Sequence, residues 1–306
     1  MSSNLPVEPI ASLFLRCVNA IGVCMNYRHA FHAGNFADVF KHALLTRILL
    51  YLLRKPTPIR YIDTHAGIGL YDLTSPQALR SGESKQGIER ILTTQFEAPV
   101  RELLQPWLDQ VHSCADATGK ACYPGSPLLA AQLLRPQDRL ILCELHKDDR
   151  RLLTRHMGRD ARLKVIEMDG YMGLKAFVPP MERRGLVLID PPFEQPDEFE
   201  FLAEGFLAAY RRWPTGTYAL WYPLKHPSQA HHLAHHLIAS GVKRLLRIEM
   251  DICAWRAEGP LTGCGFLLVN PPHVLAEESQ ALLPALTHAL AIGEGADWRL
   301  EQLAGE

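Results

Sequence analysis

Short apolar runs, each ended by polar residues, glycine or proline, recur along the chain and predict β-strands. They lie at residues 59–67, 138–146, 162–170, 185–193, 216–224, 243–250 and 264–272. Between several of these runs, apolar residues recur at three- and four-residue spacing, which predicts helices over residues 37–54, 199–212 and 228–240. Strands that alternate with helices favour an α/β fold, with a seven-stranded, mostly parallel sheet covered by helices on both faces.

The first two predicted strands are unusually far apart. In a doubly wound sheet, the acid that ends the second strand follows the glycine loop by about 20 residues, whereas Glu144 follows Asp63 by 81 residues. The additional segment has a helical pattern in its middle and is bounded by SGES and YPGSP. We therefore predict a main domain formed by residues 25–71 and 123–306, and a small helical insertion subdomain over residues 72–122 near the carboxyl edge of the sheet.

Composition narrows the possible partners. The 306 residues are 47% hydrophobic and 21% charged, which excludes a largely disordered or fibrous protein. Lys and Arg number 32 against 33 Asp and Glu, so the formal net charge is −1. This balance excludes a strongly basic nucleic-acid-binding coat and leaves contact with nucleic acid to a local patch. The candidates for that patch are Arg28, Arg80, Lys85, Arg183 and Arg184.

The cysteines and the longest apolar runs indicate the compartment. Seven scattered cysteines without a CxxC pair do not form the pattern of a zinc ribbon or a secreted disulfide framework. No apolar run approaches the ~20 residues of a membrane span. We expect a cytoplasmic monomer without a membrane partner. Residues 1–24 are expected to be a poorly ordered N-terminal extension, with an added amphipathic helix as the alternative.

A glycine-containing segment, DTHAGIG at residues 63–69, ends the first predicted strand. Gly67 and Gly69 would let the backbone approach a cofactor closely. The third glycine of a GxGxxG motif is absent, which favours a nucleoside cofactor over a dinucleotide. A purely structural turn is the alternative interpretation.

Acidic residues end the next two predicted strands. Glu144 could accept two hydrogen bonds from ribose hydroxyls, and Asp169, followed by Gly170, could reach the exocyclic amine of an adenine. Each acid alone would more often be a strand end or a helix cap. Suitable residues at three strand ends of one sheet together favour a cofactor site.

The strongest motif is Asp190-Pro191-Pro192-Phe193, directly after an apolar run. It fits the [DNS]-PP-[FYW] pattern of methyltransferases that act on exocyclic amines. The lone pair of adenine N6 is delocalised into the ring, so an acceptor such as Asp190 would help turn it toward a methyl donor. Pro191 would stiffen the turn, and Phe193 would offer a face for stacking an extruded base. The alternative is a proline-terminated strand with a core phenylalanine.

A second segment of similar form, Asn270-Pro271-Pro272-His273, lacks the aromatic residue. It follows a strand that is expected to run antiparallel, so it would lie at the opposite edge of the sheet. We interpret it as structural.

The segment YRHAFHAGNFADVFKH, residues 27–42, is dense in polar and aromatic side chains. Asn35 is predicted to cap the following helix, which would place Lys41 and His42 where they could face a cofactor carboxylate. A solvated polar surface is the alternative. Four histidines at residues 231, 232, 235 and 236 have metal-ligand spacing on a predicted helix, but no nearby acid or cysteine completes a shell, so no metal is predicted.

Together these blocks resemble the ribosomal RNA large subunit methyltransferase J family, which methylates N6 of an adenine in 23S rRNA. The blocks are YRHAFHAGNFADVFKH, DTHAGIGLYDL, YPGSP, CELH, DG, RRGLVLIDPPF and GTYALWYP, in this order from about Met25 to Pro272. Phe193 departs from the family, which often has tyrosine there, and the N-terminal extension is a second departure.

The resemblance implies a Rossmann-like, S-adenosylmethionine-dependent methyltransferase with 23S rRNA as its substrate and no metal. It implies Asp190 as the catalytic acceptor, Tyr27 as a residue that touches the RNA, with Arg28 and Phe193 as further substrate-binding candidates, and an insertion that covers the RNA-binding side. The implied cofactor-binding residues are Lys41, His42, His65, Ser126, Glu144, Asp169, Gly170 and Asp190, which join Gly67 of the glycine turn.

Three alternatives stay open. A methyltransferase of this kind could act on DNA adenine or on guanine N2. A nucleotide-dependent oxidoreductase could use the glycine turn, although the missing third glycine and the DPPF turn argue against it. A non-catalytic RNA-binding protein could keep the fold, although intact Asp190 and Phe193 disfavour it.

Overall fold

The computed structural model describes residues 28–256 and 258–305 of the chain. The predicted N-terminal extension over residues 1–24 and the candidate Tyr27 therefore lie outside the described residues. None of the helices within the described ranges is long and apolar enough to cross a membrane.

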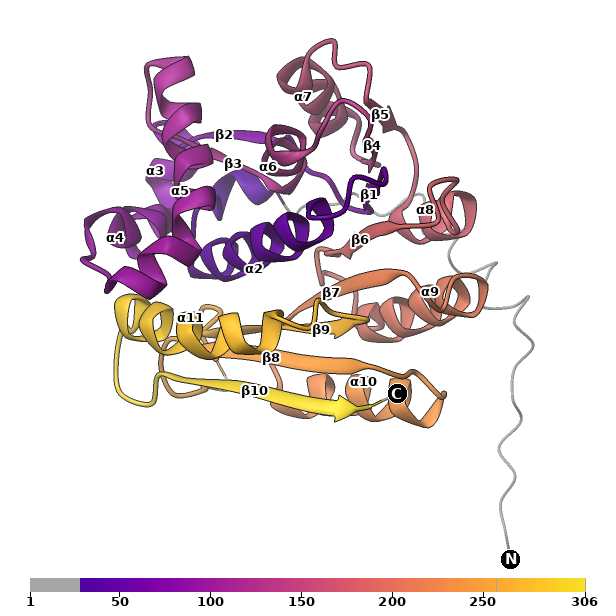
Figure 1. The fold of residues 1–306 in the computed structure, drawn as a ribbon. Coiled ribbons are helices and arrows are strands. Elements are labelled where there is room, and N and C mark those ends of the chain that lie inside the picture. The colour runs from indigo at the N-terminus through magenta and orange to yellow at the C-terminus, as the bar shows by residue number, and fades with distance from the viewer. Residues whose placement is uncertain (1–27, 257, 306) are drawn as a thin grey trace, which may run out of the picture.

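An eight-stranded sheet forms the centre of the molecule (Figure 1), in the order β10-β8-β9-β7-β6-β1-β4-β5. The strands β1, β4, β5, β6 and β7 pair in parallel, and β9 runs antiparallel to both β7 and β8. The predicted α/β class is therefore confirmed. The strand bounds are β1 Arg60–Asp63, β4 Arg139–Cys143, β5 Leu163–Ile166, β6 Gly185–Ile189, β7 Thr217–Pro223, β8 Leu245–Asp251, β9 Gly263–Val269 and β10 Asp297–Ala304.

The predicted number of seven strands is wrong by one. The additional strand, β10, is antiparallel to β8 at the edge of the sheet. An edge strand pairs on one side only, and the residues of β10 are exposed or half-buried. Its sequence, DWRLEQLA, can therefore include charged side chains. A short polar segment of this kind does not show the apolar run that revealed the central strands.

Helices cover both faces of the sheet, and each face has its own apolar cluster. One cluster includes buried residues of α2, α7 and α11, and the other includes those of α8, α9 and α10. The three predicted helices are confirmed as α2, α9 and α10. The helix bounds are α2 Phe36–Leu53, α6 Ser126–Leu133, α7 Lys147–Met157, α8 Gly170–Phe177, α9 Glu198–Arg212, α10 Pro227–Ala239 and α11 Leu275–Leu290.

The segment between the first two parallel strands is mainly helical. The short strands β2 (Leu70–Asp72) and β3 (Cys122–Pro124) pair antiparallel at its base. Between them lie α3 Pro76–Ser81, η3 Glu83–Gln86, α4 Ile88–Thr93 and α5 Ala98–Thr118. Figure 1 shows α3, α4 and α5 at the end of the molecule opposite the arrowheads of β9 and β10. Because β9 and β10 run against the parallel strands, these helices lie toward the carboxyl ends of the parallel strands.

The inserted helices do not have a separate core. Ile88, Leu104 and Trp107 are buried in the same apolar cluster as Phe40 and Leu44 of α2. This shared packing fixes the inserted helices firmly against α2, and so against the side chains that α2 sends toward the sheet.

Candidate active site

Three sequence-predicted acids, Glu144, Asp169 and Asp190, lie with Asp63 at the carboxyl ends of four adjacent parallel strands. The sheet order β6-β1-β4-β5 places Asp190, Asp63, Glu144 and Asp169 at neighbouring strand ends. In open α/β sheets this edge is where ligands bind. The sheet topology thus brings the three predicted acids to one edge, together with Asp63.

Glu144 is joined to the glycine turn by backbone hydrogen bonds. Its two carboxylate oxygens accept from the N–H of Gly67 at 2.8 Å and of His146 at 2.7 Å. Burial raises the pKa of Glu144 to about 7, although both hydrogen bonds act in the opposite direction. Within the described residues no cationic side chain pairs with this carboxylate, so its lone pairs remain open to a ligand that donates hydrogen bonds.

The glycine turn needs glycine at two positions. Gly67 and Gly69 have φ of 62° and 77°, which L side chains rarely adopt. A Cβ on Gly67 would also lie 2.4 Å from the hydroxyl of Tyr71. Glycine therefore allows this turn to pack closely against Tyr71 while its N–H donates to Glu144.

Asp63 forms a buried polar cluster. The hydroxyls of Ser126 and Tyr61 donate to its Oδ2 at 2.7 and 2.8 Å. Burial raises the pKa of Asp63 to about 6, against the effect of these hydrogen bonds. The cluster connects the end of β1 to the start of α6, and so fixes Ser126 at the edge of the sheet.

His42 lies on the buried side of α2. Its Nδ1 shares a hydrogen bond of 2.8 Å with the hydroxyl of Tyr123. Burial lowers the pKa of His42 to about 3, so the imidazole is neutral at physiological pH. A neutral ring can accept or donate one hydrogen bond at each nitrogen, but it cannot pair with a carboxylate as a cation.

Asp169 is the N-cap of α8, and Gly170, the first residue of that helix, lets it approach the end of β1. The Asp169 side chain accepts from the N–H of Met172 at 3.0 Å, as a helix cap does. A Cβ on Gly170 would lie 2.5 Å from both the Thr64 carbonyl oxygen and Cε1 of His65. Burial lowers the pKa of His65, which favours its neutral form.

Lys41 joins Asp190 to the α2 helix. Its Nζ donates to Oδ2 of Asp190 at 2.6 Å and lies 3.1 Å from Oδ1 of Asp38. It also lies 5.3 Å from the ring centroid of Trp221, within cation–π range. Among the described residues, no donor is hydrogen-bonded to the other oxygen of Asp190. Lys41 thus contacts a site acid directly, rather than standing free to meet a cofactor carboxylate.

Asp38 organises the segment that precedes α2. It accepts from the Gly34 N–H at 2.9 Å, and Nε2 of His29 lies 2.9 Å from the same oxygen. Burial alone would raise the pKa of Asp38, but charge interactions with His29 and Lys41 outweigh it and hold the pKa well below its usual range. As predicted, Asn35 caps α2, accepting from the N–H of Asp38.

The DPPF turn after β6 is tightly packed. Phe193 has a φ of 50°, an uncommon conformation for a bulky residue. Its ring lies 4.9 Å from that of Phe199 and 5.9 Å from that of Trp221, and only 9% of the residue is exposed. The aromatic contacts hold the turn, and little of the Phe193 ring is left for a substrate to stack on.

The second PP segment lies at the other edge of the sheet. It follows β9, which runs antiparallel to β7, and the Asn270 amide donates to the carbonyl oxygens of Pro214 and Gly216. Asn270 therefore ties the end of β9 to the loop that enters β7. The structural interpretation of this segment is confirmed.

The predicted basic residues and the histidine cluster lie at different places in the fold. Arg28 forms an ion pair with Asp149 of α7 at 3.0 Å. Arg184 lies at the opposite edge of the sheet, where it donates to backbone carbonyls of Leu52 and Thr57, so its assignment to a patch beside the site is wrong. The four histidines of α10 are exposed, and among the described residues no three His, Cys, Asp or Glu side chains are grouped to hold a metal ion.

Four contributors to the site were missed from sequence. They are Tyr61, Tyr123, Asp38 and Trp221, each in contact with a predicted residue. Asp38 could have been found, since it precedes Lys41 by three residues on a predicted helix and so lies on the same face. The other three come from separate strands, and only the fold shows their partners.

Comparison with known proteins shows the family of the chain. A family model described as ribosomal RNA large subunit methyltransferase D, RlmJ, matches residues 56–303. The chain is 41% identical over 262 residues to ribosomal RNA large subunit methyltransferase J of Escherichia coli strain K12, covering 86% of the chain and 92% of that protein. It is 38% identical over 284 residues to the protein of the same name from Haemophilus influenzae, covering 92% and 100%.

A solved structure is similar to this chain over most of its length. The crystal structure of protein LPL1258 from Legionella pneumophila has a TM-score of 0.78 and 33% sequence identity, covering 89% of this chain and 98% of that one. The family model spans most of the chain, and the two named relatives match it over nearly their whole length. The chain therefore belongs to the RlmJ family of ribosomal RNA large subunit methyltransferases.

Proposed function

We propose that this protein is an S-adenosylmethionine-dependent methyltransferase that modifies the exocyclic N6 of an adenine in 23S rRNA. One observation carries the proposal. The DPPF turn places Asp190, held by Lys41 at 2.6 Å, at the same sheet edge as the buried Glu144 and the glycine turn. An acceptor for an amine and a site for a nucleoside cofactor thus lie side by side, in a chain of the RlmJ family.

The residues present fit S-adenosylmethionine. Glu144 is buried without a cationic partner among the described residues, and a pair of ribose hydroxyls would supply the donors that this carboxylate lacks. The N–H of Gly67 donates to Glu144, so the glycine turn lies directly against this carboxylate. We assign the cofactor to Glu144, Gly67, Asp169, Gly170, His65, His42 and Ser126, with Lys41 and Asp190 beside the transferred group.

When bound, S-adenosylmethionine supplies the activated methyl group. Asp190 accepts a hydrogen bond from the adenine amine through the oxygen that Lys41 does not hold, which turns the nitrogen lone pair out of conjugation. The nitrogen loses a proton once it is alkylated, and Asp190 is placed to receive it. Lys41 fixes this carboxylate in direction through the 2.6 Å contact, so the acceptor is organised before the substrate arrives.

Phe193 and Pro191 have positioning roles in this proposal. The ring of Phe193 is largely covered by Phe199 and Trp221, so it holds the strained turn and offers only its exposed edge to the base. Pro191 fixes the backbone that follows Asp190. Tyr27 and Arg28 stay candidates for contact with the RNA. We place the activity in the cytoplasm and expect a monomer, which light scattering would check.

Methyl transfer from tritiated S-adenosylmethionine to unmodified 23S rRNA tests the proposal, with digestion to nucleosides to identify the product. We expect N6-methyladenosine. Label in guanine, or a preference for DNA, would select one of the rival methyltransferases. The absence of transfer to any nucleic acid would refute the proposed function.

Asp190→Ala should lower turnover by about 10²–10³, as the loss of one organised polar partner of a transition state does. Asn270→Ala is the matched control, because it removes a polar residue from the similar segment at the other edge of the sheet. Both variants should keep the circular dichroism of a folded chain. An active Asp190→Ala protein would show that the acceptor lies elsewhere.

A further inference from the structure

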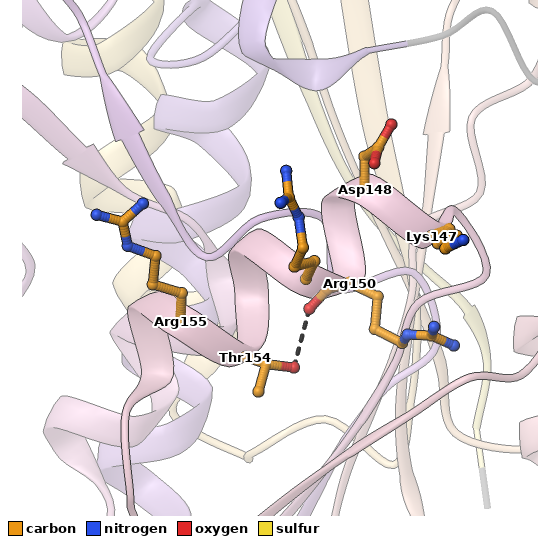
Figure 2. Close-up of a pocket in the computed structure, with 6 residues that line it drawn as sticks. Lys147, Asp148, Arg150, Thr154 and Arg155 are labelled. Carbon is orange, nitrogen blue, oxygen red and sulfur yellow. Dashed lines mark hydrogen bonds between the residues drawn. The ribbon is translucent and has the colours of Figure 1, made fainter.

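Helix α7 carries a row of exposed cations that the proposed methyl transfer does not use. Lys147, Arg151 and Arg155 follow one another at four-residue spacing, so they lie along one side of the helix, about 6 Å apart along its axis. With Asp148, Arg150 and Thr154 they line an open hollow of about 610 Å³. Figure 2 shows Lys147 and Arg155 toward opposite ends of this helix. We call Lys147, Arg151 and Arg155 the α7 row.

The cations of the α7 row are not neutralised by ion pairs with the described carboxylates. Asp149 of the same helix is buried and pairs with Arg28 at 3.0 Å, and Arg150 pairs with Glu167. No carboxylate in the described part of the chain forms an ion pair with any member of the α7 row. In a chain with a net charge of −1, this is a local excess of cations in an exposed place.

The α7 row is connected to the candidate active site. Helix α7 begins three residues after Glu144. Arg155 also lines a second hollow of about 620 Å³, together with Arg28, His29 and Tyr71. His29 contacts Asp38, which contacts Lys41, and Lys41 holds Asp190. The second hollow thus lies between the α7 row and the segment that carries the Asp190 partner.

We propose that the α7 row holds the sugar–phosphate backbone of the rRNA beside the nucleotide that is presented to Asp190. This inference rests on the proposed function. Exposed Lys and Arg bind phosphates by charge and by release of counterions, without reading sequence. Cations arranged in a row along an open hollow fit an extended polyanion better than a single phosphate group, which would need donors that converge on one point.

The test compares two triple variants with the same change of charge. Lys147→Gln, Arg151→Gln and Arg155→Gln remove the α7 row. Lys55→Gln, Arg211→Gln and Lys243→Gln form the control, because these exposed cations precede β1, β7 and β8 and so lie at the opposite edge of the sheet. Binding of an unmodified 23S rRNA transcript is measured from about 50 to 200 mM salt, a range over which phosphate contacts lose affinity steeply.

Removal of the α7 row should lower the slope of log Kd against log salt by about two to three units and weaken binding at low salt at least tenfold. KM for RNA should rise, while kcat at saturating RNA and the affinity for S-adenosylmethionine stay as in the wild type. Arg150→Gln alone should change the slope less than Arg151→Gln alone, because Glu167 already neutralises Arg150.

Two results would overturn the inference. One is a wild-type slope in the variant that lacks the α7 row, and the other is an equal loss of slope in the control variant. Neither result contradicts the proposed function if the wild-type protein still methylates 23S rRNA. A wild-type protein that neither binds nor methylates this RNA would instead refute the proposed function.

Discussion

Protonation of Glu144 should weaken the binding of S-adenosylmethionine. Only 8% of this residue is exposed, and burial raises its pKa to about 7 even though two backbone N–H groups donate to it. A protonated carboxyl group has fewer acceptor positions for the ribose hydroxyls than a carboxylate has. We therefore expect the affinity for the cofactor to fall as the pH drops below 7.

The size of the effect follows from the pKa. A carboxyl group with a pKa of about 7 is roughly one-tenth ionised at pH 6 and roughly nine-tenths ionised at pH 8. If the cofactor binds the ionised form, Kd should rise about tenfold from pH 8 to pH 6, which corresponds to about 1.4 kcal/mol. Above about pH 8 the affinity should change little, because Glu144 is then almost fully ionised.

Calorimetric titration with S-adenosylmethionine between pH 6 and pH 8 measures this dependence, and Glu144→Gln is the control. The amide does not titrate, so any pH dependence that remains in this variant belongs to the ligand or to other groups such as Asp63, whose pKa is raised to about 6. At pH 8 the variant should bind about tenfold more weakly than the wild type, since a hydrogen bond to a charged acceptor is lost. At pH 6 the two proteins should bind almost equally. The reasoning fails if the ratio of their affinities is the same at both values.

Three further substitutions probe the site. Lys41→Met leaves Asp38 and Asp190 without the cation that they share in a largely buried place. It should therefore lower the free energy of unfolding by about 3–5 kcal/mol in urea titrations. An unchanged urea midpoint would show that Lys41 does not stabilise these two carboxylates. Phe193→Ala should destabilise the protein by about 3 kcal/mol through the lost packing and reduce kcat, whereas a change confined to RNA affinity would show that the ring serves mainly to stack a base. Gly170→Ala forces a Cβ against Thr64 and His65, so it should lower the stability of the fold by about 1–3 kcal/mol and weaken cofactor binding. Gly293→Ala is the control and should be nearly neutral, because a Cβ there has ordinary contact distances. Equal melting temperatures of the two variants would show that α8 can shift to make room.

The sequence revealed the central strands because each is a short apolar run that ends in polar residues. This pattern located the sheet edge and, with it, three acids, Glu144, Asp169 and Asp190, that the fold brings together. The edge strand β10 was missed for the same reason, because an edge strand is half-exposed and its charged side chains form no apolar run. Helix α7 has few apolar residues among its many charged ones, and α11 contains an internal proline, so neither shows a long apolar helical pattern in the sequence.

The contacts between distant segments could not be predicted from sequence. Lys41 and Asp190 are separated by 149 positions, and their 2.6 Å contact depends on how α2 packs over the end of β6. The motif around Lys41 indicated a polar function, but a cofactor carboxylate was the expected partner. Helix α2 is buried on almost all sides, so the packing of the whole fold around it decides that the Lys41 amine meets Asp190, while Asp38 lies one turn away on the same helix.

The four strand-end acids also explain why this edge suits a cationic donor. Of Asp63, Glu144, Asp169 and Asp190, only Asp190 has a lysine partner among the described residues, and burial raises the pKa of both Asp63 and Glu144. Bringing carboxylates together in a place of low dielectric is unfavourable, and a nearby positive charge relieves that cost. The sulfonium of S-adenosylmethionine carries such a charge, and the product formed by loss of its methyl group does not. The same acids should therefore favour the methyl donor over its spent product, so S-adenosylmethionine should bind more tightly than S-adenosylhomocysteine in calorimetric titration.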